Sequence, residues 1–99
     1  MKQKIIELIK KEKIIAIVRG VDEEHIIPTA QALYEGGIHM MEITFDQSNP
    51  NHLVETSKLI KVVSEQMQGK ICVGAGTVMN IAQCDAAFQA GAKYFITPN

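Results

Sequence analysis

Four short, mainly apolar runs separated by helix-like segments constrain the fold of this chain more than any other feature. The runs lie at residues 14–18, 38–45, 70–73 and 93–97. The first is a continuous β-branched stretch, which is typical of a strand buried on both faces of a parallel sheet. The intervening segments carry apolar residues at helical spacing, so the order predicts strands that alternate with helices.

The first helix after a strand has recognisable ends. Asp22 is expected to cap it, and the acidic residues that follow Asp22 suit the first turn. Gly36 and Gly37 are expected to end it. Pro28 lies within this segment, which implies either a kinked helix or a helix that begins near the proline.

The other helices are predicted in the same way. One is expected from residue 49 to about residue 68, and another from a cap at Asn80 to a stop at Gly91. A short amphipathic helix is also expected over residues 5–12.

The whole pattern reads as a helix followed by β-α-β-α-β-α-β, with connections short enough for right-handed crossovers. This order fits either a (β/α) barrel or an open doubly wound sheet, as one α/β domain over residues 1–99. Four strands in an open sheet would expose strand edges. We therefore expect that the chain is truncated, or that it pairs with another copy or another fragment.

Composition excludes several classes of function. The 99 residues carry a net charge of -1, which argues against a nucleic-acid-binding surface. No apolar run approaches the ~20 residues of a membrane span. The N-terminal apolar residues are interrupted by charges, unlike a signal peptide, so a cytoplasmic location is the default expectation.

Cysteine and histidine usage predicts neither disulfides nor a metal centre. Cys72 and Cys84 each lie inside a periodic segment and are expected to be buried thiols in a reducing compartment. His25, His39 and His52 follow no local metal-binding spacing. We expect no metal or cofactor.

The second predicted strand contains the strongest candidate for chemistry. Side chains alternate across a strand, so Glu42 and Thr44 share one face, while Met41, Ile43 and Phe45 share the other and would pack under the helices. Glu42 would then point into a barrel at the end of the strands where barrel enzymes place their active sites.

A carboxylate in an apolar interior is costly unless it is paired or its pKa is raised, and a shifted carboxylate is a good acid–base group. The alternative is a glutamate on a peripheral strand edge, paired with a neighbouring cation. Arg19 ends the first strand and suits a carboxylate or phosphate ligand. It could instead pair with Glu42 or cap the strand end.

Two other features favour less specific interpretations. The segment at residues 74–77, Gly-Ala-Gly-Thr, lacks the glycine or alanine that a dinucleotide fingerprint needs at position 79, which is Met79. We interpret it as a strand-end turn that brings backbone and Thr77 close to a ligand. Lys93 opens the last run and is expected to be a surface lysine rather than a Schiff-base lysine.

Several segments, in this order and spacing, resemble the 2-keto-3-deoxy-6-phosphogluconate (KDPG) and 4-hydroxy-2-oxoglutarate (KHG) aldolase family. They are Val18-Arg19, Gly36-Gly37-Ile38, Met41-Glu42-Ile43-Thr44, residues 73–78 and residues 91–98. The resemblance implies a (β/α)8 barrel of which this chain covers about the first four strands. It also implies a homotrimeric class I aldolase without a metal, which cleaves a keto acid to pyruvate and an aldehyde through a lysine Schiff base.

The resemblance also assigns roles to residues. Glu42 would be the catalytic acid–base residue, and Arg19 would bind the pyruvate carboxylate. Thr77 and Pro98 would border the pyruvate pocket, with Thr44 near them.

Three departures from the family pattern bear on activity. Many members carry an arginine where this chain has Asp46, so Arg19 is expected to supply that charge, and the usual serine before the last proline is Thr97. The family's Schiff-base lysine belongs to a sixth strand, beyond Asn99, so these 99 residues alone are expected to be inactive. The alternative function is a non-catalytic half-barrel module whose copies pair to hide their sheet edges.

Overall fold

The computed structural model describes residues 14–97. Strands and helices alternate along the chain, as the sequence predicts, and the strands are parallel. In chain order the elements are β1 (Ala16–Val18), α2 (Glu23–Glu35), β2 (Met40–Thr44), α3 (His52–Gln66), β3 (Cys72–Gly76) and α4 (Ile81–Ala90). The predicted helix over residues 5–12 lies outside the described residues.

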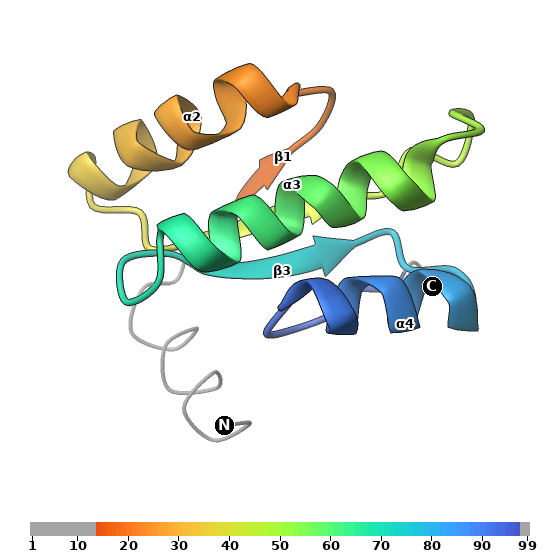
Figure 1. Cartoon of the computed structure of the whole chain (residues 1–99). Coiled ribbons are helices and arrows are strands. Elements are labelled where there is room, and N and C mark those ends of the chain that lie inside the picture. Colours follow the sequence, from red (N-terminus) through yellow and green to blue (C-terminus); the bar gives the residue numbers. More distant parts are fainter. Residues whose placement is uncertain (1–13, 98–99) are drawn as a thin grey trace.

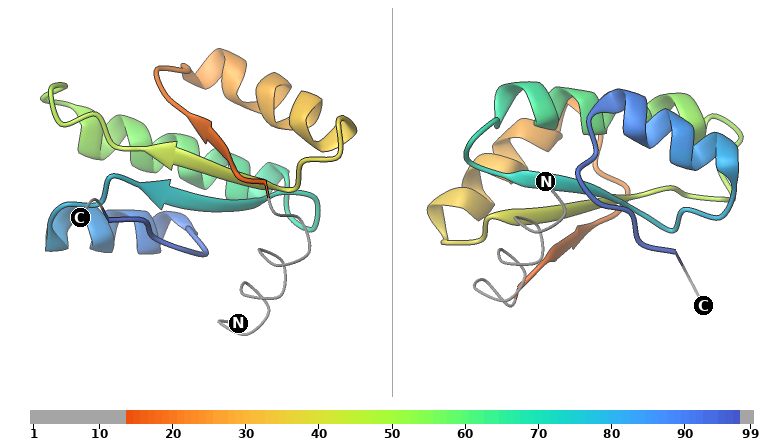
Figure 2. Two further views of the ribbon diagram at one scale, coloured as in Figure 1. Left: turned by 180° about the vertical axis from the view of Figure 1, so that it is seen from behind. Right: turned by 90° about the horizontal axis from the view of Figure 1, so that it is seen from below.

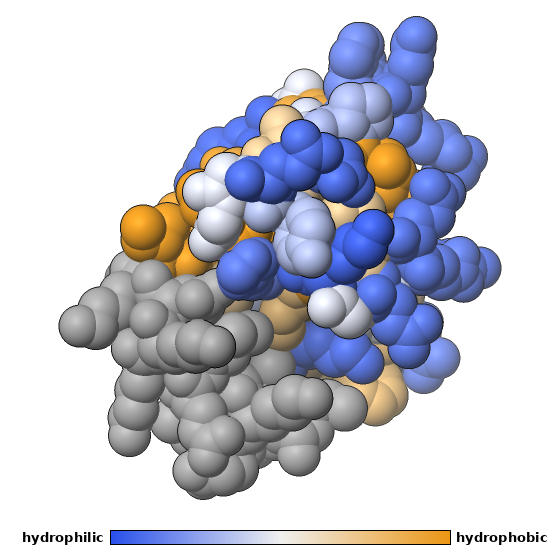
Figure 3. All heavy atoms as spheres, turned by 90° about the vertical axis from the view of Figure 1, so that its left-hand side faces the viewer, coloured by the Kyte–Doolittle hydropathy of each residue, from blue (hydrophilic) through white to orange (hydrophobic). Residues whose placement is uncertain are grey.

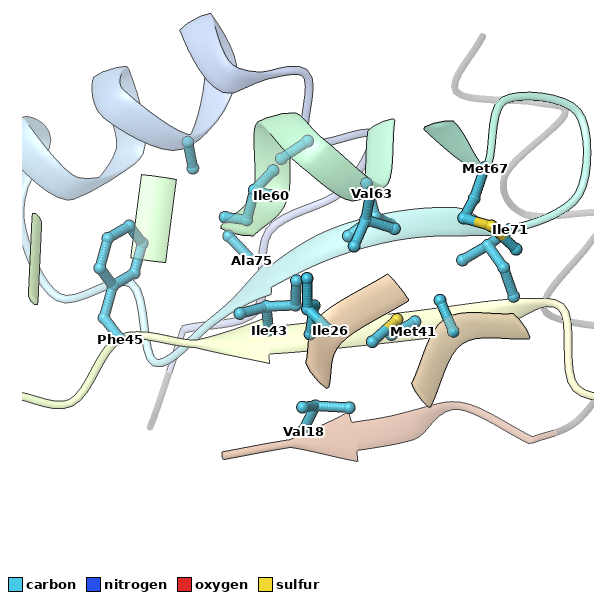
Figure 4. Close-up of a cluster of buried hydrophobic side chains, with 14 of the residues drawn as sticks. Val18, Ile26, Met41, Ile43, Phe45, Ile60, Val63, Met67, Ile71 and Ala75 are labelled. Carbon is cyan, nitrogen blue, oxygen red and sulfur yellow. The ribbon is translucent and has the colours of Figure 1, made fainter. Parts of the chain in front are cut away.

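The three helices cover one face of the sheet, whose strand order is β1-β2-β3 (Figures 1 and 2). Met41, Ile43 and Phe45 point toward these helices and are buried with Ile60 and Val63 of α3 (Figure 4). The predicted alternation in β2 is therefore confirmed. Burial of each such side chain contributes roughly 1.5–3 kcal/mol, so this layer fixes which face of β2 turns away from the helices.

Helix α2 begins where the capping residue predicts. The Asp22 carboxylate accepts a hydrogen bond from the backbone N–H of His25 at 3.0 Å, and the helix begins at Glu23. Pro28 is therefore inside the helix, and a start near the proline is excluded. The N–H of Gly36 still bonds to the carbonyl of Ala32 as the helix ends.

Helix α4 also has the predicted ends. The Asn80 side chain accepts a hydrogen bond from the N–H of Gln83 at 2.8 Å. Gly91 ends the helix with a φ of 104°, a left-handed conformation that favours glycine. Helix α3 runs from His52 to Gln66, so it is shorter than the helix predicted from residue 49 to about residue 68.

The last apolar run does not form the regular fourth strand that the sequence predicts. A single parallel bridge joins Phe95 to Ala75, and Ala75 bonds to both Tyr94 and Ile96. Thr77 has a φ of 54°, which ends the extended conformation of β3, and beyond it the two segments are joined by a bond from the N–H of Val78 to the carbonyl of Ile96 at 3.0 Å. The described sheet therefore has three strands, and the segment at residues 93–96 lies along the free edge of β3.

The surface at the end of the sheet where the strands begin is mainly polar (Figure 3). At the end where the strands begin and α2 ends, the described surface is mainly hydrophilic, with small apolar patches (Figure 3). The backbone N–H of Lys93 donates to the carbonyl of Val73 near the start of β3, and Lys93 is exposed, as expected of a surface lysine.

Within residues 14–97, no helix is both long enough and apolar enough to cross a membrane.

Candidate functional site

The sheet face opposite the helices carries the residues that the sequence singles out. Glu42 lies between Ile17 of β1 and Gly74 of β3, and Thr44 lies opposite Gly76. Side chains on laterally paired residues share a face. We call this surface the Glu42 face; it comprises Met40, Glu42, Thr44, Cys72, Gly74, Gly76 and Tyr94.

Glu42 is a buried carboxylate on the central strand of the described sheet. Its side chain is 7% exposed and lies over Gly76, where any β-carbon would collide with the carboxylate and lie 2.6 Å from the Thr44 methyl group. Burial raises the pKa of Glu42, and the positive charge of Arg19 opposes this effect. Because β2 is the central strand, a peripheral edge position is excluded, and the raised pKa of this carboxyl is typical of a group that takes up and releases protons.

Arg19 acts on this face through its charge. It is exposed, follows β1 directly, and forms no ion pair with Glu42 within the described part of the chain. Asp46, at the family's arginine position, accepts hydrogen bonds from the hydroxyl of Ser48 at 2.6 Å and from its N–H at 3.0 Å. These bonds lower the pKa of Asp46, and they hold its carboxylate in its own loop.

The two predicted threonines lie at the C-terminal ends of neighbouring strands. Thr44 is buried, and its hydroxyl donates a long 3.4 Å hydrogen bond to the carbonyl of Val18. Thr77 follows β3, is half-buried, and has the positive φ already noted. The structure thus brings Glu42, Thr44, Arg19 and Thr77 to one end of the sheet, while Pro98 lies outside the described residues.

Gly74 and Gly76 make room for side chains on the Glu42 face, whereas the sequence predicts a turn close to a ligand. Gly74 and Gly76 both lie in β3 and face the same side. The ring of Tyr94 occupies the space where a Gly74 side chain would be, just as the Glu42 carboxylate occupies the space above Gly76. Alternate glycines in a strand signal this kind of close approach, and that signal points to the face on which Tyr94 lies.

The cysteines differ from one another. Cys72 is half-buried on the Glu42 face, and burial raises the pKa of its thiol while the charge of Lys93 opposes the shift. Cys84 is exposed, so the prediction that it is buried is wrong. Helix α4 buries Gln83 and Ala87, and Cys84 follows Gln83 by about 100° around the helix, which turns it toward solvent.

A polar network that the sequence did not reveal lies beside Thr77. Gln83 is 1% exposed; its amide donates to Gln47 Oε1 at 2.7 Å and to His52 Nε2 at 2.9 Å, while its oxygen accepts from the N–H of Met79 at 2.7 Å. His52 Nδ1 lies 2.7 Å from the carbonyl of Asn49. With these partners, Nδ1 of His52 donates to the carbonyl of Asn49 and Nε2 accepts from the Gln83 amide.

This network holds the turn at Thr77. Gln47 donates from its amide to the carbonyl of Thr77 at 3.0 Å, so the loop after β2 is bonded to the loop after β3. Gln83 is 31 residues from His52 and 36 residues from Gln47 in the sequence. No local spacing signals contacts of that range, which is why sequence reasoning missed Gln83.

We expect Gln83→Leu to lower the free energy of unfolding by about 2–3 kcal/mol, because it removes the acceptor of the part-buried Met79 N–H and the donor to Gln47 and His52. Urea denaturation of the chain measures this effect. Gln89→Leu makes the same chemical change at an exposed position of α4 and should change stability by less than about 0.5 kcal/mol. Equal effects of the two substitutions would contradict the importance of the network.

No cluster of three or more His, Cys, Asp or Glu side chains that could hold a metal ion occurs among residues 14–97. The residues gathered at this end of the sheet are a buried carboxylate, two threonines and a nearby guanidinium. Such a set can bind a small anionic molecule and move protons on it.

Comparison with known sequences shows which family the chain resembles. The model of the family "KDPG and KHG aldolase" matches residues 5–99. The chain is 30% identical over 94 residues to the 2-dehydro-3-deoxy-phosphogluconate aldolase of Treponema pallidum. This match covers 95% of the chain and 41% of the relative.

Solved structures give the same answer. The KDPG aldolase of Zymomonas mobilis ZM4, crystallised with 3-phosphoglycerate, superposes with a TM-score of 0.77 at 28% identity and covers 100% of this chain and 44% of that one. The KDPG aldolase of Legionella pneumophila, with pyruvate captured as a covalent carbinolamine, gives 0.71 at 29% identity and covers 86% and 38%. The chain spans less than half the length of these relatives, and it belongs to the KDPG and KHG aldolase family.

Proposed function

We propose that this chain supplies the first β/α units of a (β/α)8 class I aldolase. The enzyme would cleave a 2-keto-3-deoxy-6-phospho sugar acid or 4-hydroxy-2-oxoglutarate, reversibly, to pyruvate and an aldehyde. The observation that carries the proposal is the buried Glu42 carboxylate in the central strand, which lies over Gly76 toward the C-terminal end of the strands, where barrel enzymes carry their chemistry. Membership of the family supports the reaction class.

Glu42 would be the acid–base group in this reaction. A lysine amine condenses with the keto carbon of the substrate, and the protonated imine draws electrons from the neighbouring bonds. The Glu42 carboxylate takes the proton of the C4 hydroxyl as the bond between C3 and C4 breaks; the electron pair of that bond forms an enamine, and C4 leaves as the aldehyde. Glu42 in its protonated form then gives a proton to C3, and the imine of pyruvate is hydrolysed. In the other direction, the Glu42 carboxylate removes that proton.

The other predicted residues would bind the substrate. Arg19 would hold the carboxylate of pyruvate, since its guanidinium is the cation whose charge lowers the pKa of Glu42. Thr44, Thr77 and Pro98 would border the pocket. No metal or cofactor is needed, because the imine supplies the electron sink.

The Schiff-base lysine would come from sequence that completes the barrel. The covalent pyruvate carbinolamine of the Legionella relative supports an imine route for this family. We use "complete barrel" for the protein in which this chain is joined to that remaining sequence. The complete barrel would assemble as a homo-oligomer, with the trimer as the expected form.

Borohydride trapping tests the proposal. Incubation of the complete barrel with pyruvate and borohydride, in the presence of EDTA, should add one reduced pyruvate to one lysine, as seen by mass spectrometry. The 99-residue chain treated in the same way should show no adduct, because its surface Lys93 lacks an apolar site. A complete barrel that forms no adduct would refute the proposed mechanism.

A second function, that of a half-barrel assembly module, is favoured by exposed apolar side chains at both edges of the Glu42 face. Ile17 of β1 is 60% exposed, and Ile96 is 42% exposed. In the complete barrel the remaining strands would cover them, whereas in isolated chains a second copy would do so. A strictly monomeric, folded chain by light scattering would argue against the module.

A further inference from the structure

The Tyr94 hydroxyl is a buried polar group that no contact within residues 14–97 explains. The residue is 8% exposed, and its oxygen has no hydrogen-bond partner. Leaving a hydroxyl buried without a partner is costly, so native structures almost always pair it with another group or with water. We therefore expect this hydroxyl to have a hydrogen-bond partner in the working protein.

Backbone hydrogen bonds fix where the Tyr94 ring lies. Lys93 donates to the carbonyl of Val73 at 2.8 Å, and the N–H of Ala75 donates to the carbonyl of Tyr94 at 3.0 Å. These bonds hold Tyr94 on the far side of β3 from β2. The ring crosses β3 at Gly74, with Cε2 and Cζ among the atoms nearest to the glycine.

This geometry directs the hydroxyl toward Glu42. The oxygen is attached to Cζ, which lies over Gly74, and Gly74 is the direct partner of Glu42 on the next strand. Neighbouring strands are about 4.8 Å apart, and successive residues on one face of a strand are about 6.6 Å apart. The Glu42 carboxylate, which lies over Gly76, and the Tyr94 hydroxyl are therefore neighbours on the Glu42 face, and the charge of Glu42 acts on the Tyr94 phenol.

The charged and titratable groups around these two side chains are few. Cys72 of β3 and Glu42 of β2 both raise the pKa of Tyr94, after the larger effect of burial. Arg19, which follows β1, acts on Glu42, and Lys93 acts on Cys72. The pKa of the phenol is thus well above its ordinary value, and Tyr94 remains a hydrogen-bond donor throughout the pH range in which enzymes work.

We propose that Tyr94 is a positioning residue for Glu42: its hydroxyl donates a hydrogen bond to the Glu42 carboxylate, which rotation of the Glu42 side chain brings within reach. The bond would stabilise the charged form of Glu42 and orient the oxygen that takes the proton. This inference rests on the proposed aldolase function, because it assigns a partner to the same acid–base residue.

The direction of the expected pH effect follows from the charge of the bonded form. A donor favours the carboxylate and lowers its pKa, so removal of the hydroxyl in Tyr94→Phe should raise the pKa of Glu42 further. Removal of a proton from C3 of bound pyruvate needs the charged form. The acid limb of that rate should therefore move to higher pH by about one unit, while the rate well above the limb stays within about twofold.

The experiment follows exchange of the pyruvate methyl protons for deuterium by NMR, over a range of pH, in the complete barrel. Tyr94→Phe keeps the ring over Gly74 and so should keep the fold. Tyr34→Phe is the matched control, because Tyr34 is half-buried on α2, where its ring contacts His39 and the ammonium of Lys70.

A shifted acid limb in Tyr94→Phe alone would support the inference. An unchanged limb, or the same shift in both variants, would overturn it while leaving the aldolase proposal intact. Borohydride trapping of the unsubstituted protein separates the two proposals: if it forms no pyruvate adduct, both fall together.

Discussion

Glu42→Gln is expected to lower the rate of pyruvate release from the complete barrel by about 10²–10⁴-fold, the usual contribution of a general acid–base group. Glutamine has nearly the same shape as glutamate, so it should keep its place over Gly76. It cannot accept or donate the proton that the C3 carbon exchanges. A coupled assay for pyruvate measures the loss, and Glu65→Gln, at an exposed position of α3, is the matched control.

The same substitution should have the opposite effect on stability at neutral pH. Burial raises the pKa of Glu42 in the folded state, so the folded chain binds the proton more tightly than the unfolded chain does. The contribution of Glu42 to stability is therefore full at low pH and is lost as pH rises through the raised pKa. Glu42→Gln removes this loss, and its unfolding free energy should fall less with rising pH than that of the unsubstituted chain.

Gly74→Ala is expected to destabilise the chain by about 3 kcal/mol, at the upper end of the usual cost of overpacking a core. The backbone at Gly74 does not have a positive φ, so the cost is steric. The added methyl group would collide with the Tyr94 ring, and backbone hydrogen bonds on both sides of Tyr94 prevent the ring from moving aside. Urea denaturation measures the effect.

Two further variants make this prediction specific. Gly36→Ala has ordinary contacts, with its β-carbon 3.4 Å from the carbonyl oxygen of Ala32, and should cost far less. Tyr94→Ala makes room for the methyl group, so the double variant with Gly74→Ala should be less destabilised than the sum of the two single changes. Additive effects in this cycle would show that the ring and the glycine do not compete for the same space.

Local patterns predicted the parts of the fold that local physics determines. Asp22 and Asn80 cap their helices because a short side-chain oxygen reaches the free N–H groups of the first turn. Alternation in β2 placed Met41 and Ile43 under the helices and Glu42 on the opposite face because side chains in a strand alternate. The carboxylate of the candidate site was therefore found from one segment alone.

The remaining features depend on segments that meet only in the folded chain. The last run resembles a strand in its composition, yet among the described residues it forms only one bridge with β3, whose extended conformation ends at Thr77. Cys84 is exposed because α4 turns Gln83 inward, toward partners more than thirty residues away. Tyr94 belongs to the site only because Gly74 lets its ring cross β3 toward Glu42.

The most direct test of the central claim, that Glu42 moves the proton in an imine-forming aldolase, combines two readings on one variant. Glu42→Gln in the complete barrel should still trap pyruvate with borohydride, since imine formation uses the lysine. Its exchange of pyruvate methyl protons in deuterated water, followed by NMR, should fall by about 10²–10⁴-fold. Methyl exchange at the unsubstituted rate, with normal trapping, would show that another group moves the proton and would contradict the claim.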